Sequence, residues 1–248
     1  MINKIKKKPK VIIIIPARLK SERLQKKLLK NINGLPMIVR VAKNAEDLKL
    51  GKVFVGTDSL EIFNVCRNEN IKTIITKQKH ESGSDRVQEV YEMVNEKFDL
   101  IVNLQGDLPI FEKDLLDKTI SLFIDPSVDI GSAVCELSDE EIIDKNIVKA
   151  KVNLNKNGVG IAEDFKREIK SNKNFYHHIG VYVYKPEILK KFVNLKQTRN
   201  EKQRMLEQMR ALDNNLKIKL VKMSYNPPSV DTYEDLRKIR LIFKKNNL

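Results

Sequence analysis

The sequence predicts an α/β fold in which helices cover both faces of a mainly parallel sheet. Short apolar runs alternate with amphipathic helical patterns along most of the chain, which is the arrangement expected of repeated βαβ units. The chain has 248 residues, of which 41% are hydrophobic, and this length can bury a sizeable core. Because neither an internal repeat nor a low-complexity linker interrupts the pattern, we expect residues 1–248 to form a single domain.

The predicted strands are short apolar runs, and several of them are closely followed by proline or glycine. They cover residues 11–15, 53–55, 71–75, 100–104, 128–134, 147–154, 179–184 and 217–221. The last two alternate polar and apolar residues, as half-exposed strands do. The asparagine-rich stretch 155–174 is predicted to be a polar excursion from the sheet.

The predicted helices follow from apolar residues spaced three and four positions apart. The helix over residues 36–50 begins at Pro36, which suits a first helical turn, and places Ile38, Val41 and Ala45 on one face. The other predicted helices cover residues 59–68, 85–97, 112–124, 186–193, 201–213 and 232–245. Polar loops over residues 16–35 and 77–84 complete the first half of the chain.

The composition predicts a globular, cytoplasmic protein. No apolar run approaches the ~18 residues that a membrane helix needs, and the basic N-terminal segment lacks a signal-peptide core. Cys66 and Cys135 are too few for a disulfide framework or a zinc site. The net charge of +14 comes from lysines spread through nearly every segment. This favours a lysine-rich surface over a nucleic-acid-binding arm, and small polyanionic substrates fit the same field.

The run Leu100-Ile-Val-Asn-Leu-Gln-Gly-Asp-Leu-Pro109 predicts a buried strand that ends in a turn. Ligands of α/β proteins gather past the carboxyl ends of such strands, and Gly106 lets a ligand approach the backbone. Asp107 is therefore a candidate metal ligand. The competing interpretation is that Asp107 caps the helix that follows, because aspartate is a favoured cap residue.

The loop after the first strand is rich in cations. It contains neither a G-x-G-x-x-G turn nor a Walker loop, but Arg18, Arg23 and Lys27 together would neutralise a triphosphate. An ordinary solvated basic loop would carry the same charges. Two neighbouring features favour the binding role: Thr57-Asp58 ends the second strand, and Ser82-Gly83-Ser84-Asp85-Arg86 precedes a helix, where anions bind.

An ordered series of motifs runs through nearly the whole chain. It comprises Ile-Pro-Ala-Arg-x-x-Ser-x-Arg at 15–23, Asn-Gly-x-Pro-Met-Ile at 33–38, Thr-Asp at 57–58, His-x-Ser-Gly-Ser-Asp-Arg at 80–86, Val-Asn-Leu-Gln-Gly-Asp-x-Pro at 102–109, Asn-x-Val-Lys at 146–149, His-Ile-Gly-Val-Tyr at 178–182, Leu-Glu-Gln-Met-Arg at 206–210 and Val-Asp-Thr-x-Glu-Asp-Leu at 230–236. This series resembles the family of 3-deoxy-manno-octulosonate (Kdo) cytidylyltransferases.

The resemblance implies a Rossmann-like nucleotidyltransferase fold and a specific reaction. Such enzymes transfer a cytidylyl group from CTP to the anomeric hydroxyl of a sugar acid, release pyrophosphate and use Mg²⁺, in lipopolysaccharide biosynthesis. The family is typically dimeric. The resemblance therefore implies that residues of about 175–222 form the acceptor site and a small β-rich dimerisation arm, with the alternating strands at 179–184 and 217–221.

The resemblance also implies roles for particular residues. Arg18, Lys27, Asp107 and Asp231 would be catalytic, and the two aspartates would hold Mg²⁺. The nucleotide would be bound by Pro16, Ala17, Arg18, Ser21, Arg23, Lys27, Thr57, Asp58, Ser82, Gly83, Arg86 and Gln105. The sugar acid would be bound by His178, Tyr182, Glu207 and Gln208.

Several of these residues also have an ordinary structural interpretation. Asp231 precedes a helical pattern and fits an N-cap. His178 and Tyr182 lie on a predicted strand and would then be packed side chains. Glu207 and Gln208 lie on a predicted helix and would then be solvated. The local pattern alone favours these structural roles, whereas the ordered resemblance favours the functional ones.

The sequence departs from the family pattern mainly on the acceptor side. The family's Gln-Gly-Asp-Glu-Pro has Leu108 in place of glutamate, and its Pro-Gly-Lys-Pro reads Gln-Lys-Lys-Leu at 25–28. The family's Tyr-Phe-Ser-Arg segment is missing at 161–165, His177 replaces an arginine, and Arg204 replaces an acidic residue. The sequence therefore predicts the use of CTP more firmly than the use of Kdo.

Two alternatives to Kdo activation remain open at the level of the sequence. An amino-substituted Kdo, or another nonulosonic acid, is a candidate acceptor, because Glu163 and Asp164 would attract a positively charged substituent. A non-catalytic, nucleic-acid-binding protein on the same scaffold is the alternative from another class. Salt-dependent DNA binding without pyrophosphate release would distinguish it.

Overall fold

The computed structural model describes residues 8–246. Its strands are β1 (Val11–Ala17), β2 (Asn31–Ile32), β3 (Leu35–Pro36), β4 (Lys52–Thr57), β5 (Thr73–Ile75), β6 (Leu100–Asn103), β7 (Ile130–Cys135), β8 (Lys149–Val152), β9 (Val159–Lys166), β10 (Phe175–Tyr184) and β11 (Ile218–Lys222). Its helices are α1 (Met37–Asp47), α2 (Leu60–Asn68), α3 (Gly83–Met93), α4 (Lys113–Ser121), α5 (Asp139–Ile143), α6 (Pro186–Val193), α7 (Arg199–Arg204), α8 (Gln208–Asp213) and α9 (Tyr233–Lys245), with 3-10 helices η1 (Lys27–Leu29) and η2 (Leu122–Ile124).

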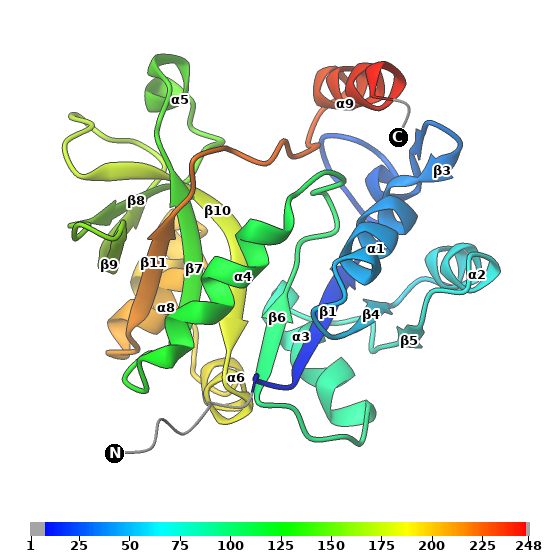
Figure 1. The fold of residues 1–248 in the computed structure, drawn as a ribbon, viewed down its shortest axis with the longest axis horizontal. Coiled ribbons are helices and arrows are strands. Elements are labelled where there is room, and N and C mark those ends of the chain that lie inside the picture. The colour runs from blue at the N-terminus through cyan, green and yellow to red at the C-terminus, as the bar shows by residue number, and fades with distance from the viewer. Residues whose placement is uncertain (1–7, 247–248) are drawn as a thin grey trace.

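Across residues 8–246, nine strands form one sheet in the order β5-β4-β1-β6-β10-β7-β11-β9-β8 (Figure 1). The four strands β5, β4, β1 and β6 are parallel, with Ile13 paired to Val53 on one side and to Val102 on the other. β10 runs antiparallel to both of its neighbours β6 and β7. The predicted α/β class is confirmed, but the sheet as a whole is mixed, because its second half combines antiparallel pairs with one parallel pair, β7 and β11.

The second half of the sheet closes on itself. β10 pairs with β7 and, at its start, also with β8, and the pairings of β7 with β11, β11 with β9 and β9 with β8 complete a ring. β9 lies within the stretch that the sequence predicted to leave the sheet, so that prediction is wrong. Ala162 and Phe165 of β9 are buried, and their burial explains why a mostly polar segment joins the sheet.

Helices cover both faces of the parallel half, as the sequence predicted. Ile13 and Ile15 of β1 pack in one core with α1, α2, α4 and α9. Ile12 and Ile14 pack in a second core with α3, α6 and α8. Because successive side chains of a strand point to opposite faces, this run of four isoleucines supplies both cores.

The helices differ from the prediction in three places. The predicted helix over 201–213 is two helices, because Met205 adopts a left-handed backbone with φ 52° at the end of α7. α5 forms where no helix was predicted, and the predicted loop 16–35 contains η1 and most of the β2–β3 hairpin. No helix among residues 8–246 is both long and apolar enough to cross a membrane.

Candidate active site

Two adjoining cavities lie past the carboxyl ends of β1 and β6. The larger has a volume of about 480 Å³ and the smaller of about 210 Å³, and Pro16, Arg18 and Gln105 line both. β1 and β6 are parallel neighbours, so the loops that follow them meet at the same edge of the sheet. The cation-rich loop and the turn containing Asp107 are therefore brought together.

The structure brings most of the predicted site residues to these two cavities. The larger cavity is lined by Pro16, Ala17, Arg18, Ser82, Gly83, Arg86, Gln105 and Glu207. The smaller cavity is lined by Pro16, Arg18, Ser21, Arg23, Lys27, Gln105, Asp107 and Asp231. The predicted residues that line neither of these cavities are Thr57, Asp58, His178, Tyr182 and Gln208.

Lys27 lies between the two predicted metal-binding carboxylates. Its Nζ is 2.7 Å from Asp107 Oδ2 and 2.9 Å from Asp231 Oδ1. The backbone N–H of Val230 donates to the Asp107 carbonyl at 3.0 Å and holds the two loops together. Burial by itself would lower the pKa of Lys27, but attraction to both carboxylates outweighs burial and raises the pKa. The ammonium therefore stays charged at neutral pH.

Neither of these carboxylates caps a helix. α4 begins after Glu112, beyond Asp107. α9 is capped by Thr232, whose hydroxyl accepts a backbone N–H of the first helical turn. The side chain of Asp231 instead faces the smaller cavity, where Arg23 NH2 is 3.1 Å from its Oδ2. The capping interpretation is therefore wrong for both aspartates, whose carboxylates instead pair with Lys27 beside the smaller cavity.

Thr57 and Asp58 support the wall of the larger cavity from behind. Arg86 of α3 is buried, and it donates from NH2 to Asp58 Oδ2 at 3.2 Å and from NH1 to the Thr76 hydroxyl. The Thr57 hydroxyl accepts the backbone N–H of Ser59 at 3.1 Å. Asp58 thus holds α3 through Arg86, whereas Thr57 orders the turn that leads into α2. Direct contact of either residue with a nucleotide stays a prediction.

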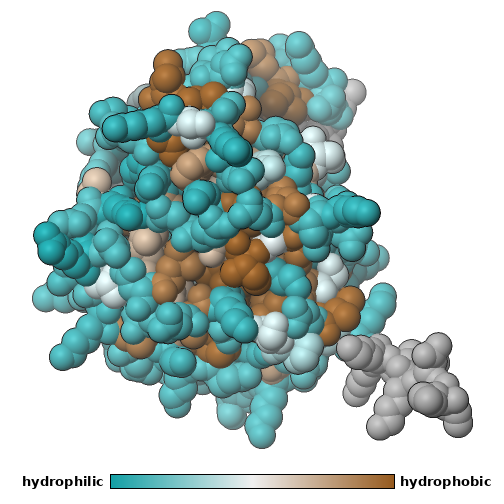
Figure 2. All heavy atoms as spheres, turned by 90° about the vertical axis from the view of Figure 1, so that its left-hand side faces the viewer, coloured by the Kyte–Doolittle hydropathy of each residue, from teal (hydrophilic) through white to brown (hydrophobic). Residues whose placement is uncertain are grey.

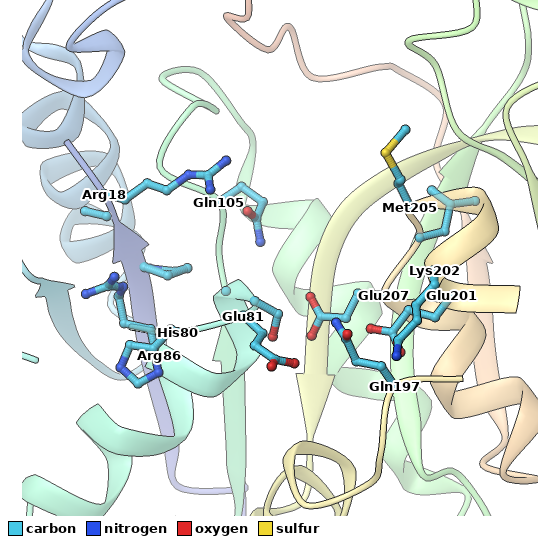
Figure 3. A pocket seen from close by; sticks show the side chains of 15 residues that line it. Arg18, His80, Glu81, Arg86, Gln105, Gln197, Glu201, Lys202, Met205 and Glu207 are labelled. Carbon is cyan, nitrogen blue, oxygen red and sulfur yellow. The ribbon is translucent and has the colours of Figure 1, made fainter. Parts of the chain in front are cut away.

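The opposite wall of the larger cavity carries the carboxylate of Glu207 (Figure 3). Its Oε1 is buried and accepts no hydrogen bond from the described residues, and burial raises the pKa of Glu207. Burial likewise raises the pKa of the Tyr182 hydroxyl well above its usual value. Tyr182 lines neither cavity, and the nearby Glu207 carboxylate also raises the pKa of its hydroxyl.

His178 is a packed side chain in this structure. Its Nε2 lies 2.9 Å from the Ser132 hydroxyl, and its ring contacts those of Phe165 and Tyr182 with centroids 5.0 and 5.4 Å away. Burial lowers the pKa of His178 to about 3, so the imidazole is neutral. Gln208 is buried as well. The contacts of both residues with a sugar acid stay predictions.

The sequence did not predict the wall that α7 and the turn after it provide. Gln197, Lys202 and Met205 line the larger cavity opposite Arg18 (Figure 3). Met205 is 77% exposed and turns the chain between α7 and α8. One signal was available, since Thr198 to Glu201 has the capping-box spacing that marks a helix start.

Comparison with known proteins identifies the class to which this fold and site belong. Residues 12–218 match the family model described as cytidylyltransferase. The chain therefore belongs to the cytidylyltransferase family of enzymes.

Curated relatives narrow this class further. The chain is 37% identical over 239 residues to the 3-deoxy-manno-octulosonate cytidylyltransferase of Paramagnetospirillum magneticum, covering 94% of this chain and 97% of the relative. It is 38% identical over 239 residues to the enzyme of the same name from Brucella anthropi, covering 94% of this chain and 96% of the relative. Within the family, the chain groups with the 3-deoxy-manno-octulosonate cytidylyltransferases, so the resemblance seen in the sequence is confirmed.

Solved structures agree with this assignment. The structure of CMP:2-keto-3-deoxy-manno-octonic acid synthetase complexed with CTP is 30% identical and superposes with a TM-score of 0.85, covering 96% of this chain and 99% of that chain. UDP-glucose pyrophosphorylase complexed with UDP-glucose is only 14% identical, with a TM-score of 0.67 and coverage of 96% and 99%. The second match shows a shared fold alone.

Proposed function

We propose that this enzyme activates Kdo with CTP for lipopolysaccharide biosynthesis. It transfers a cytidylyl group to the anomeric hydroxyl of the sugar acid and releases pyrophosphate. The observation that carries the proposal is the position of Lys27 between Asp107 and Asp231, in a cavity that Arg18 also lines. The curated relatives carry the name of this reaction, and the similar solved synthetase was complexed with CTP.

The smaller cavity suits the triphosphate of CTP. Arg18, Arg23 and Lys27 bring three cations to it. Arg18 lines both cavities, so its guanidinium can bind phosphate oxygens where the two cavities join. Lys27 contributes a compact charge that moves with a flexible side chain. We assign Arg18 and Lys27 to the charge that develops on the departing pyrophosphate.

Asp107 and Asp231 are suited to hold Mg²⁺. Among residues 8–246, no group of three or more His, Cys, Asp or Glu is placed to hold a metal ion. Two carboxylates are enough for Mg²⁺, because it completes its shell with substrate phosphates and water. Both carboxylates already face a cation, the Lys27 ammonium. Bound Mg²⁺ would neutralise phosphate charge and orient the attacking hydroxyl and the leaving group in line.

The contacts of β9 weaken the case for an amino-substituted acceptor. Asp164 pairs with Arg204 and, at 3.1 Å, with Lys166, while Glu163 pairs with Lys151 at 2.9 Å. Neither carboxylate lines either cavity. Because their charges already have partners within the protein, they offer little attraction to a positively charged sugar, and we propose Kdo itself as the acceptor.

We further infer that the enzyme acts in the cytoplasm as a homodimer. Figure 2 shows the side of the molecule on which β8 and β9 lie in Figure 1, and apolar side chains gather near the centre of this face. Two large apolar residues are exposed in this part of the fold, Ile143 of α5 at 82% and Ile161 of β9 at 45%. Contiguous apolar surface of this kind favours association between chains.

A pyrophosphate-release screen tests the proposed reaction. The protein is mixed with Mg²⁺ and offered each of the four nucleoside triphosphates together with a panel of eight- and nine-carbon keto-sugar acids. We expect CTP with Kdo to give the fastest release. Faster release with another sugar acid would reassign the acceptor. No release with any pair, together with salt-dependent DNA binding, would favour the nucleic-acid-binding alternative.

A further inference from the structure

Asn146 reaches the phosphate-binding loop from outside both cavities. It lies in the loop between α5 and β8, and its side-chain Oδ1 accepts a hydrogen bond from Arg23 NH1 at 3.1 Å. The two residues are 123 positions apart. The other terminal nitrogen of the same guanidinium, NH2, is 3.1 Å from Asp231 Oδ2. Arg23 therefore joins Asn146 to one of the two proposed Mg²⁺ ligands.

The amide of Asn146 is held in one orientation by its own loop. Its backbone N–H and its side-chain Nδ2 donate to Asp144 Oδ1 at 2.8 and 3.0 Å. Its backbone carbonyl accepts from Arg167 NH1 at 3.0 Å. Because Nδ2 is engaged with Asp144, Oδ1 is the polar atom left to face Arg23.

A buried lysine anchors this loop to the ring of strands. Lys149, at the start of β8, is fully buried, and its Nζ donates to the Asp144 carbonyl and, at 2.7 Å, to the Arg167 carbonyl. A buried ammonium without such acceptors would be costly, so these carbonyls are fixed relative to β8. The loop that carries Asn146 is thus anchored to β8, in the ring of strands.

Arg23 needs such a partner because its own side chain is 49% exposed. A long exposed side chain loses rotamer freedom when it is held in one ion pair, and surface pairs alone contribute little. A second partner on a rigid base reduces that cost. With Arg23 fixed on Oδ2 of Asp231, Oδ1 of the same carboxylate stays directed at Lys27.

We propose that Asn146 is a positioning residue for CTP binding, acting through Arg23 on Asp231. This inference rests on the proposed function, because it assumes that Asp231 serves the phosphate site. Asn146 does not touch the reacting atoms. Its role is to connect the loop between α5 and β8 to the phosphate-binding loop. This connection fixes the position of Arg23 relative to Asp231.

Two nearly isosteric variants distinguish this positioning role from a role confined to the loop between α5 and β8. Asn146→Asp keeps an oxygen acceptor for Arg23 but loses the donor to Asp144, whereas Asn146→Leu loses both contacts. If Asn146 acts through Arg23, the Leu variant should weaken CTP binding about three- to tenfold, the range of the net contribution of a typical hydrogen bond. The Asp variant keeps an acceptor for Arg23 but turns a carboxylate oxygen toward Asp144, so it should bind CTP less tightly than the unmodified enzyme and more tightly than the Leu variant.

Calorimetric titration with CTP and Mg²⁺ measures this binding without the acceptor, and steady-state assays give the two KM values. We expect the Leu variant to raise KM for CTP more than KM for Kdo. In an Arg23→Ala background, Asn146→Leu should change CTP affinity by less than about twofold, because the partner is already gone. Asn194→Ala is the control, since among residues 8–246 the Asn194 side chain bonds its own helix alone, through Nδ2 to the Lys190 carbonyl.

Three results would overturn the inference. The Leu variant could bind CTP as tightly as the unmodified enzyme, or the Asp variant could bind CTP as weakly as the Leu variant. Asn146→Leu could also lower CTP affinity in the Arg23→Ala background by as much as it does in the unmodified enzyme. These outcomes are distinguishable from failure of the proposed function. If the proposed function is wrong, the unmodified enzyme will itself release no pyrophosphate from CTP and Kdo. If the Leu variant fails to fold, Asn146→Ala, which also removes both contacts, replaces it in the unmodified and the Arg23→Ala backgrounds.

Discussion

Lys27 contacts two carboxylates that lie 80 and 204 residues away along the chain. Each of the three residues could be predicted separately, because each follows a strand end or lies in a polar loop. The local pattern could not predict their mutual contact, since it depends on how the C-terminal loop returns past β6. Only the family resemblance placed the two aspartates at one Mg²⁺ site. The same limit applies to Asn146, whose partner Arg23 is equally remote.

Replacing Lys27 by methionine should remove a stabilising contribution that depends on pH. The pKa of Lys27 is raised above its unfolded value of 10.5, so the contribution is fully present below pH 10.5 and is lost as the pH rises through the folded pKa. Urea unfolding should therefore show a stability gap between wild type and variant that narrows at strongly alkaline pH. A gap that stays constant across that range would contradict this assignment.

Replacing Asp107 by asparagine should nearly abolish pyrophosphate release while leaving the fold intact. Loss of one metal ligand removes several kcal/mol of charge stabilisation, which corresponds to about a hundredfold in rate or more. Asp114→Asn is a suitable control, because Asp114 pairs with Lys118 on the exposed face of α4 at 2.8 Å. Retained activity in the Asp107 variant would exclude the metal-binding role.

At the scale of elements, the turn between α7 and α8 depends on one buried ion pair. Glu201 accepts from Arg210 Nε at 2.9 Å and from NH2 at 2.6 Å, and both side chains are buried. This pair spans the break at Met205 and holds the wall of the larger cavity together.

Glu201→Gln should therefore destabilise the protein strongly. Removing one member of a buried pair leaves the other charge uncompensated, at a cost of about 3–5 kcal/mol. A substitution at the exposed neighbouring Lys202, such as Lys202→Gln, should change stability by less than about 0.5 kcal/mol. Urea denaturation measures both variants, and equal small losses would show that the pair does not stabilise this turn.

The elements that the sequence predicted well are those with a continuous apolar pattern. The first five residues of β1 and all of β6 are buried, and α1 has a regular apolar face. The local sequence is therefore enough to predict each of these elements. β9 has only two buried side chains, Ala162 and Phe165, and its asparagine-rich surroundings resemble a loop. Tertiary contacts impose the break at Met205. Because neither glycine nor proline occurs there, the local sequence does not predict it.

At the scale of the whole molecule, the site lies where the parallel half of the sheet meets the ring of strands. The loops after β1 and β6 and the start of α3 provide one wall of the larger cavity, and α7 with the following turn provides the other. Neither half alone would enclose a nucleotide and a sugar acid. The chain as a whole carries a net charge of +14, which favours the approach of anionic substrates.

Sedimentation velocity should show the homodimer that we infer from the apolar face of Figure 2. Because apolar surface gains free energy when it is removed from water, we expect a species of twice the chain mass of 28.7 kDa. Replacing Ile161 by lysine should shift the equilibrium toward the monomer. A protein that sediments as a 28.7 kDa species at all concentrations would contradict the dimer.

The most direct test of the account is a crystal structure of the enzyme with CTP and Mg²⁺. We predict a metal ion bound through oxygen atoms of Asp107 and Asp231 at about 2.0–2.1 Å, with Lys27 moved from between the carboxylates onto a phosphate. Arg18 should contact the triphosphate in the same complex. An ion bound elsewhere, with both carboxylates still paired to Lys27 and no phosphate beside them, would contradict the central claim.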